Sequence, residues 1–288
     1  MLLGFSDYRE QASALAVKLG MAYKEATIHR FPDGESKVTL PPNLPENLII
    51  CRSLNDPNSK LVELLLAART ARELGARHLT LVAPYLCYMR QDIAFRPGEA
   101  VSQKIIGNFL ASLFDALITV DPHLHRIARL NEAVPLQQSE ALSAAPLIAE
   151  FLTRQNNPLL IGPDSESLQW VRSIAELCDF GYGVASKERL GDRKVLIELP
   201  DIDLRGRRVV LIDDVVSSGE TMAIAAQNCL SAGAERVDAL VTHALFAAGA
   251  EQRIHQAGAS EIWSTDSIAH SSNAIFLAPL LSKTLEKF

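Results

Sequence analysis

The chain has 288 residues, a formal net charge of −6 at pH 7, 48% hydrophobic residues and 22% charged residues. This composition is typical of a globular protein, and the length allows two ordinary α/β domains. The negative charge argues against general nucleic-acid binding, which needs a basic face. No apolar stretch reaches the roughly 18 residues of a membrane span and no signal peptide is recognisable, so we expect a cytoplasmic protein without a membrane partner. The cysteines lack the spacing of a zinc site or a disulfide framework.

Strand-like and helix-like segments alternate along the chain, which predicts parallel sheets flanked by helices. Strands are expected over 47–53, 78–86, 116–123, 157–164, 193–199, 207–213, 236–246 and 261–268. Helices are expected over 7–19, 59–75, 100–113, 166–178, 220–233 and, at the end of the chain, about 275–288.

The second half of the chain repeats the plan of the first, which predicts two similar α/β domains that meet near 141–148. We expect an N-terminal domain over 1–144 and a C-terminal domain over 145–288, with the terminal helix free to pack on the first. Neither a GxGxxG turn nor a GxxxxGK[ST] loop occurs. A bound nucleotide would therefore not be held by a Rossmann fingerprint or a Walker loop.

The stretch RVVLIDDVVSSGET, residues 208–221, carries the strongest functional signal. Its apolar run predicts a buried parallel strand, and Asp213 and Asp214 stand at the carboxyl end, where ligands of open α/β sheets bind. A small-residue turn and the start of a helix follow, formed by Ser217, Ser218, Gly219 and Thr221. Backbone N–H groups at such a turn suit a phosphate, and the carboxylates suit sugar hydroxyls or a cation. The alternative is a strand that ends in a solvated acidic turn.

This stretch resembles the signature loop of phosphoribosyltransferases and ribose-phosphate pyrophosphokinases. Glu220 stands where those proteins usually carry a second Gly, and Ser217 where they often carry Asp. We expect the Glu220 carboxylate to point away from a bound phosphate, because it would otherwise repel the ligand.

Further segments, in order along nearly the whole chain, resemble the ribose-phosphate pyrophosphokinase (phosphoribosyl pyrophosphate synthase) family. The resemblance implies two phosphoribosyltransferase-like, Rossmann-like domains that transfer the pyrophosphoryl group of ATP to ribose 5-phosphate. In FPDGE, residues 31–35, it implies that Phe31, Asp33 and Glu35 recognise adenine in a neighbouring subunit's site. Self-association as a dimer or hexamer is therefore expected. Taken alone, Asp-Gly would mark only a hairpin turn.

Three other segments supply the remaining ATP and metal residues that the resemblance implies. In PYLCYMRQD (84–92), Arg90, Gln91 and Asp92 match nucleotide-binding positions, and Arg96 stands near the place of a further charge in the family. In VDPHLH (120–125), His123 matches a residue beside the ATP phosphates and their Mg²⁺, while His125 has no such counterpart. In IGPDSES (161–167), Asp164 matches a metal-region carboxylate, although Glu166 and Ser167 replace the family's Gly pair.

The charged segment SKERLGDR (186–193) matches a mobile catalytic loop of the family, which assigns Lys187 and Arg189 to the stabilisation of the transferring group. The alternative is a solvated loop. Asp213 and Asp214 would bind the ribose hydroxyls, and the turn after them the 5-phosphate.

Three other functions stay open at this point. A phosphoribosyltransferase would use the same 208–221 stretch, but FPDGE and RQD would then have no role. A non-catalytic regulatory homologue would keep the fold without the reaction. A purely structural α/β module is the third alternative.

Overall fold

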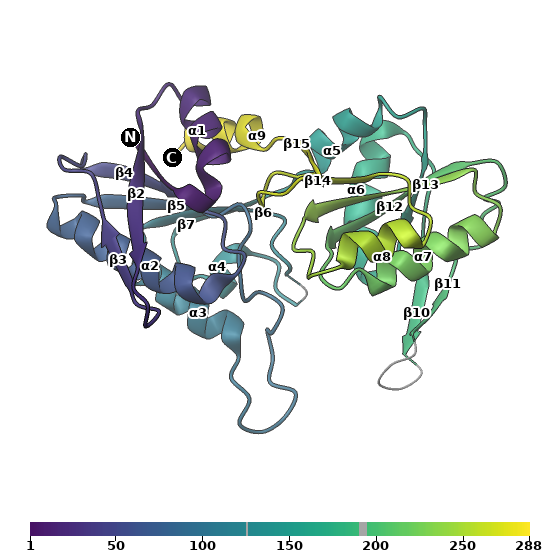
Figure 1. Ribbon diagram of the computed structural model, residues 1–288, viewed down its shortest axis with the longest axis horizontal. Coiled ribbons are helices and arrows are strands. Elements are labelled where there is room, and N and C mark those ends of the chain that lie inside the picture. Colours follow the sequence, from purple (N-terminus) through teal and green to yellow (C-terminus); the bar gives the residue numbers. More distant parts are fainter. Residues whose placement is uncertain (125, 190–194) are drawn as a thin grey trace. The chain divides into compact units, whose positions relative to one another are not determined.

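The computed structural model describes residues 1–124, 126–189 and 195–288, and its chain divides into two compact units (Figure 1). Unit 1 comprises Met1–Ser143, Ser267–Ala269 and Ala278–Phe288, and unit 2 comprises Ala144–Asp266 and His270–Leu277. Each unit is an open α/β sheet with helices packed on it, as the alternating sequence pattern predicts. No helix in the described ranges is long and apolar enough to cross a bilayer.

Unit 1 is built on a seven-stranded sheet with the order β3-β2-β1-β4-β5-β6-β7. Neighbouring strands are parallel except β2 and β3, which form an antiparallel hairpin. The central strands are apolar runs buried on both faces, as parallel strands covered by helices require. The strands are β1 (Leu2–Phe5), β2 (Tyr23–Arg30), β3 (Ser36–Thr39), β4 (Asn47–Cys51), β5 (His78–Val82), β6 (Ala116–Val120) and β7 (Gln138–Leu142).

The helices of unit 1 begin and end at residues that favour helix termini. In α2, Pro57 occupies the first turn, where its missing N–H costs nothing, and Gly75 with φ of 101° follows the end. Helix α1 packs against α9 (Figure 1). The helices are η1 (Ser6–Tyr8), α1 (Arg9–Lys18), α2 (Pro57–Glu73), α3 (Ser102–Ala111), α4 (Leu130–Ala133) and α9 (Ala278–Leu285).

Unit 2 is built on a six-stranded, all-parallel sheet with the order β15-β14-β13-β12-β8-β9. Its strands are β8 (Leu159–Gly162), β9 (Tyr182–Val184), β12 (Arg208–Val215), β13 (Arg236–His243), β14 (Ile262–Thr265) and β15 (Asn273–Ile275). A separate antiparallel hairpin joins β10 (Ser186–Arg189) to β11 (Val195–Glu198).

Two pairs of helices cover the unit 2 sheet, with α5 packed against α6 and α7 packed against α8. The helices are α5 (Ala145–Leu152), η2 (Ser165–Ser167), α6 (Leu168–Cys178), α7 (Glu220–Ser231) and α8 (Ala250–Gln256). The strand order makes β8 and β12 the switch point of the sheet, because the chain continues from β8 to β9 on one side and from β12 to β13 on the other. Open α/β sheets bind ligands at the carboxyl ends of the strands at such a point.

The terminal segment differs from the single helix expected over about 275–288. Asn273–Ile275 form strand β15 beside β14, and α9 begins only at Ala278. The Asp266 carboxylate accepts the Leu277 N–H at 2.8 Å, and Pro279 follows in the first turn of the helix. This bond and the missing N–H of proline place the helix start after the strand.

Candidate functional site

The carboxyl ends of β8 and β12 bring three acidic residues of unit 2 together. Asp164 lies two residues after β8, whereas Asp213 and Asp214 lie just before the last residue of β12. Burial raises the pKa of Asp213 well above its ordinary value, and the nearby charges of Asp214 and then Asp164 raise it further. Asp214 is only 2% exposed. This concentration of negative charge favours a cation or a group of hydroxyl donors at the switch point.

The turn after β12 is fixed from one side by the segment that follows β13. The carbonyls of Val216 and Ser217 accept the N–H groups of Phe246 and Ala247 at 3.0 and 2.8 Å. The next carbonyl, that of Ser218, accepts the Arg253 guanidinium of α8.

All three carbonyls are therefore bound by the segment that runs from the end of β13 into α8. The N–H groups of Ser217 and Ser218 make no hydrogen bond within the described ranges. Gly219 continues the turn with φ of 75°, and a Cβ there would lie 2.9 Å from the Ala250 carbonyl oxygen. The turn can thus offer its N–H groups to an anion without losing internal bonds.

Glu220 and Thr221 open helix α7 directly after this turn. The Glu220 side chain is exposed, and its N–H lies 3.4 Å from the Ser218 hydroxyl. Ser217 and Ser218 are also exposed, whereas Thr221 is half-buried. The residues expected to hold the 5-phosphate therefore lie on the turn after β12 and on the first residues of α7.

The turn after β8 keeps its shape without the Gly pair of the family. Asp164 caps η2 by accepting the Glu166 N–H at 3.1 Å, and the buried Ser167 hydroxyl donates to the Asp164 carbonyl at 2.6 Å. The Ser167 hydroxyl fills the space beside Gly162, where a Cβ would lie only 2.2 Å from it. The substitution to Ser167 is therefore accommodated by the missing side chain of Gly162.

The expected loop over 186–193 is wrong for its first four residues. Ser186–Arg189 form strand β10, in which Lys187 pairs with Ile197 and Arg189 with Val195 of β11. The polar sequence gives no strand signal of its own, because the ladder bonds and the apolar residues come from the partner strand. Residues 190–194 lie outside the described ranges.

In unit 1, the FPDGE segment is the tight loop of the β2–β3 hairpin. The Phe31 N–H donates to the Glu35 carbonyl at 2.8 Å, and the Glu35 N–H donates to the Asp33 carboxylate at 3.1 Å. Gly34 has φ of 93°, which favours glycine at this point of the turn. The loop leaves Phe31 41% exposed.

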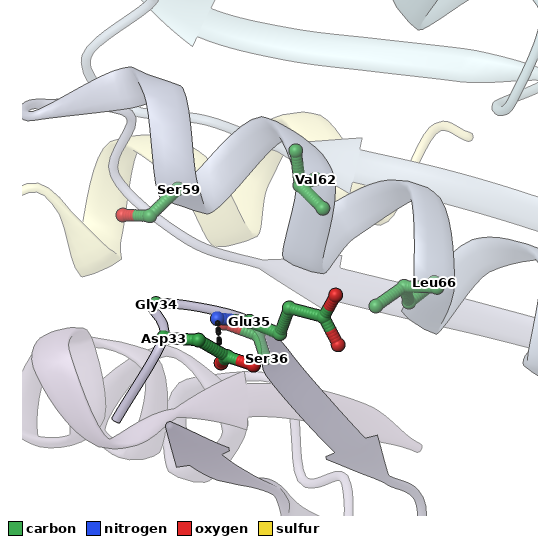
Figure 2. Close-up of a pocket in the computed structure, with 7 residues that line it drawn as sticks. All are labelled: Asp33, Gly34, Glu35, Ser36, Ser59, Val62 and Leu66. Carbon is green, nitrogen blue, oxygen red and sulfur yellow. Dashed lines mark hydrogen bonds between the residues drawn. The ribbon is translucent and has the colours of Figure 1, made fainter. Parts of the chain in front are cut away.

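A cavity of about 540 Å³ separates this loop from helix α2 (Figure 2). Asp33, Gly34, Glu35 and Ser36 line one side, and Ser59, Val62 and Leu66 of α2 line the other. Asp33 and Glu35 are exposed and thus available to a ligand or a second chain.

The RQD segment follows β5 and rests on the start of α3. Arg90 is exposed, and the Gln91 side chain accepts the Ser102 hydroxyl at 3.0 Å. Asp92 is 8% exposed and pairs with Arg126 at 2.6 Å. Sequence reasoning overlooked Arg126, since no local pattern links residues so far apart. Arg96 is exposed.

His123 follows β6, the neighbour of β5, and is half-buried. Asp121, just before it, has φ of 37°, so the chain turns sharply where the strand ends. His125 lies outside the described ranges. Because β5 and β6 are parallel neighbours, the RQD segment and His123 lie at the same edge of the unit 1 sheet.

The two expected metal residues belong to different units, His123 to unit 1 and Asp164 to unit 2. A metal ion shared between them therefore stays a prediction. Within the described ranges, no group of three or more His, Cys, Asp or Glu side chains is arranged as a complete metal site. The carboxylates after β8 and β12 would need water or substrate oxygens to complete the coordination of Mg²⁺, as this ion usually does.

Comparison with known proteins identifies relatives along nearly the whole chain. Residues 1–113 match the model of the N-terminal domain of ribose phosphate pyrophosphokinase, and residues 136–274 match the phosphoribosyl transferase domain. The ribose-phosphate pyrophosphokinase of Methanopyrus kandleri is 32% identical over 290 residues, which cover 99% of this chain and 98% of that protein. The protein of the same name from Saccharolobus solfataricus is 35% identical over 249 residues, 83% of this chain and 82% of the relative.

The fold has a full-length counterpart among solved structures. The crystal structure of phosphoribosylpyrophosphate synthetase from Mycobacterium smegmatis superimposes with a TM-score of 0.83, at 22% identity, over 99% of this chain and 97% of that one. This likeness extends over both α/β units. Taken with the near-complete match to relatives more than 30% identical, it shows that the chain belongs to the ribose-phosphate pyrophosphokinase family.

Proposed function

We propose that this chain is a ribose-phosphate diphosphokinase, which transfers the pyrophosphoryl group of Mg-ATP to the anomeric hydroxyl of ribose 5-phosphate and gives phosphoribosyl pyrophosphate and AMP. The observation that carries the proposal is the turn after β12, in which the carbonyls of Val216, Ser217 and Ser218 are bound from one side. The N–H groups of Ser217 and Ser218 make no hydrogen bond within the described ranges. Relatives that carry the name of this activity over 99% of the chain support it.

The ribose 5-phosphate site lies in unit 2. Ser217, Ser218, Gly219 and Thr221 hold the 5-phosphate through N–H and hydroxyl groups, aided by the N-terminus of α7. Asp213 and Asp214 accept hydrogen bonds from the ribose hydroxyls. Sugar hydroxyls or a cation would offset the crowding of negative charge by Asp214 and Asp164 that helps to raise the pKa of Asp213.

The ATP site uses residues of unit 1. Phe31 stacks on the adenine, and the carboxylates of Asp33 and Glu35 accept hydrogen bonds from its exocyclic amine. Arg90 and Gln91 contact the nucleotide, with Asp92 holding Arg126 beside them at 2.6 Å. His123 lies by the phosphates.

The donor set fits Mg²⁺, since the carboxylates of unit 2 supply oxygen ligands, which this ion prefers. Asp164 and His123, the latter through bound water or phosphate, would hold the ion. When bound, the metal neutralises charge on the phosphate oxygens.

Positioning and charge stabilisation account for the reaction without a covalent intermediate. The anomeric hydroxyl attacks the β-phosphorus in line, and AMP leaves. We assign Lys187 and Arg189, which belong to β10, to the stabilisation of the negative charge that develops on the transferring group.

Self-association is part of the proposal because the family resemblance implies it. In the family, the counterpart of FPDGE reaches into the ATP site of a neighbouring subunit. In this chain FPDGE follows β2 and the RQD segment follows β5, with β1 and β4 between them. We therefore propose a dimer or a hexamer.

The proposal is tested by incubating the purified protein with ATP, Mg²⁺ and ribose 5-phosphate and analysing the nucleotides. AMP that forms in step with phosphoribosyl pyrophosphate, and only when the sugar phosphate is present, is the expected result. ADP in its place would mean an ordinary kinase. The absence of nucleotide turnover would favour a regulatory homologue or a phosphoribosyltransferase.

A further inference from the structure

A single carboxylate on α2 binds both ends of the FPDGE loop. Glu63 is 0% exposed. Its Oε1 accepts the Ser36 hydroxyl at 3.0 Å and lies 3.4 Å from the Arg30 guanidinium. Arg30 is the last residue of β2 and Ser36 the first of β3, so the loop over 31–35 hangs between these two contacts.

The other oxygen of Glu63 is held inside unit 1. Its Oε2 accepts the guanidinium of Arg52 at 2.6 Å, and Arg52 is itself only 3% exposed. Arg52 also pairs with Asp7 at 3.1 Å and stacks over the Phe5 ring at 4.2 Å. The carboxylate is therefore anchored at the carboxyl ends of β1 and β4.

Burial of such a pair contributes little net stability, because the loss of hydration offsets most of the attraction. What it supplies is a fixed geometry. Arg30 adds a second tie to α2 through the Ser59 hydroxyl at 3.3 Å. Inside the loop, hydrogen bonds link only loop residues to one another. The loop's own bonds set its shape, and Glu63 sets its position relative to α2.

We propose that Glu63 is a positioning residue for base recognition: through Arg30 and Ser36 it holds Phe31, Asp33 and Glu35 in the orientation that selects adenine. The proposal rests on the proposed function, which assigns these loop residues to the nucleotide. Figure 2 shows the loop and α2 facing each other across the cavity that these contacts keep open.

The test leaves the buried Glu63–Arg52 pair intact and removes the contacts that Glu63 makes with the two ends of the loop. Arg30→Gln combined with Ser36→Ala changes residues outside the core, since the Arg30 side chain is 62% exposed and Ser36 is half-buried. In steady-state assays of the full chain, the KM for ATP should rise about ten-fold, as expected when one neutral and one charged hydrogen bond are lost. The kcat and the KM for ribose 5-phosphate should change less than about two-fold, and the preference for ATP over GTP should fall.

Two further variants control this result. Arg30→Lys with Ser36→Thr keeps a cation and a hydroxyl and should restore most of the ATP affinity. Glu73→Gln removes an exposed carboxylate from the same helix, one without an ion pair or hydrogen bond in the described ranges, and should change none of the constants. A merely structural role would lower the amount of active enzyme, and so the kcat, without changing the KM for one substrate alone.

Phe31→Ala separates failure of this proposal from failure of the proposed function. If Phe31→Ala raises the KM for ATP and the double variant does not, Glu63 has no positioning role and the ATP assignment of the loop stands. If neither variant changes that constant, the loop does not bind the nucleotide, and the proposal fails with the ATP assignment on which it rests. The absence of any turnover in the parent protein would instead overturn the proposed function itself.

Discussion

The guanidinium of Arg253 on α8 donates to the carbonyl oxygen of Ser218, in the turn that we assign to the 5-phosphate. Together with the bonds from Phe246 and Ala247, it holds three consecutive carbonyls of the turn against the segment that follows β13. The shape of the turn therefore depends on a helix that follows the next strand.

Arg253→Gln should weaken ribose 5-phosphate binding, because the Ser218 peptide is then free to rotate its carbonyl towards the ligand. We expect the KM for ribose 5-phosphate to rise about five- to ten-fold, the effect of one charged hydrogen bond, with the KM for ATP unchanged. Arg172→Gln on α6 is the matched control, since Arg172 is exposed and has no partner in the described ranges. Equal constants for the two variants would contradict this role of Arg253.

Asp213→Asn should separate binding from stability. The folded chain raises the pKa of Asp213, so its negative charge costs folding free energy at neutral pH, and the neutral Asn should raise the free energy of unfolding there. The same change removes a charged acceptor and should raise the KM for ribose 5-phosphate at least about ten-fold. Urea unfolding measures the effect on stability, and steady-state kinetics measure the effect on binding, both at roughly neutral pH. A variant that lost stability as well would show that Asp213 is structural.

Asp266 should make the stability of the protein depend on pH. It is 4% exposed, and burial raises the pKa of its carboxyl to about 6. An acid whose pKa is raised on folding favours folding while it is protonated, so the free energy of unfolding should fall as the pH rises from about 4 to above 6.

Asp266→Asn keeps an oxygen that can accept the Leu277 N–H and has no charge to lose. Above pH 7 the variant should be more stable than the parent by about 3 kcal/mol, the value of a two-unit shift, and below about pH 4 the difference should vanish. Urea unfolding across this range measures it. A difference that stayed constant with pH would rule out titration of Asp266 as the cause.

Lys187→Ala should abolish most turnover while the fold stays intact. If the cation on β10 stabilises the transferring group, kcat should fall about 100- to 1,000-fold with an unchanged far-UV circular dichroism spectrum. Near-normal turnover would instead favour the alternative reading of the 186–193 segment as a solvated segment without a catalytic role.

The sequence predicts most central strands and their functional ends, because continuous apolar runs identify buried parallel strands. It misses β1, the short buried strand Leu2–Phe5 in the middle of the unit 1 sheet. It predicts edge strands poorly. Gln138–Leu142 form β7 with mostly polar, exposed residues, and Ser186–Arg189 form β10 without any apolar residue. These strands are held by the backbone bonds and packing of their neighbours, which a local pattern does not report.

The same distinction applies to the site. Asp213 to Thr221 are contiguous and could be found from the residue pattern, whereas FPDGE and RQD could be assigned only through the family resemblance. The residues that hold them in place are distant in sequence. Arg253 reaches Ser218, Arg126 reaches Asp92, and Glu63 reaches the β2–β3 loop, each from another element. Such contacts become visible only when the chain is folded.

The packing of α9 on α1 has a consequence for biosynthesis. Unit 1 takes up Ala278–Phe288 only after all of unit 2 has left the ribosome, so the half of the protein that is translated first is completed last. Until then, the face of α1 that α9 covers stays open to water and to chaperones. Unit 1 is thus completed only when unit 2 has already been made, and a translation product that ended before α9 would leave the packing face of α1 uncovered.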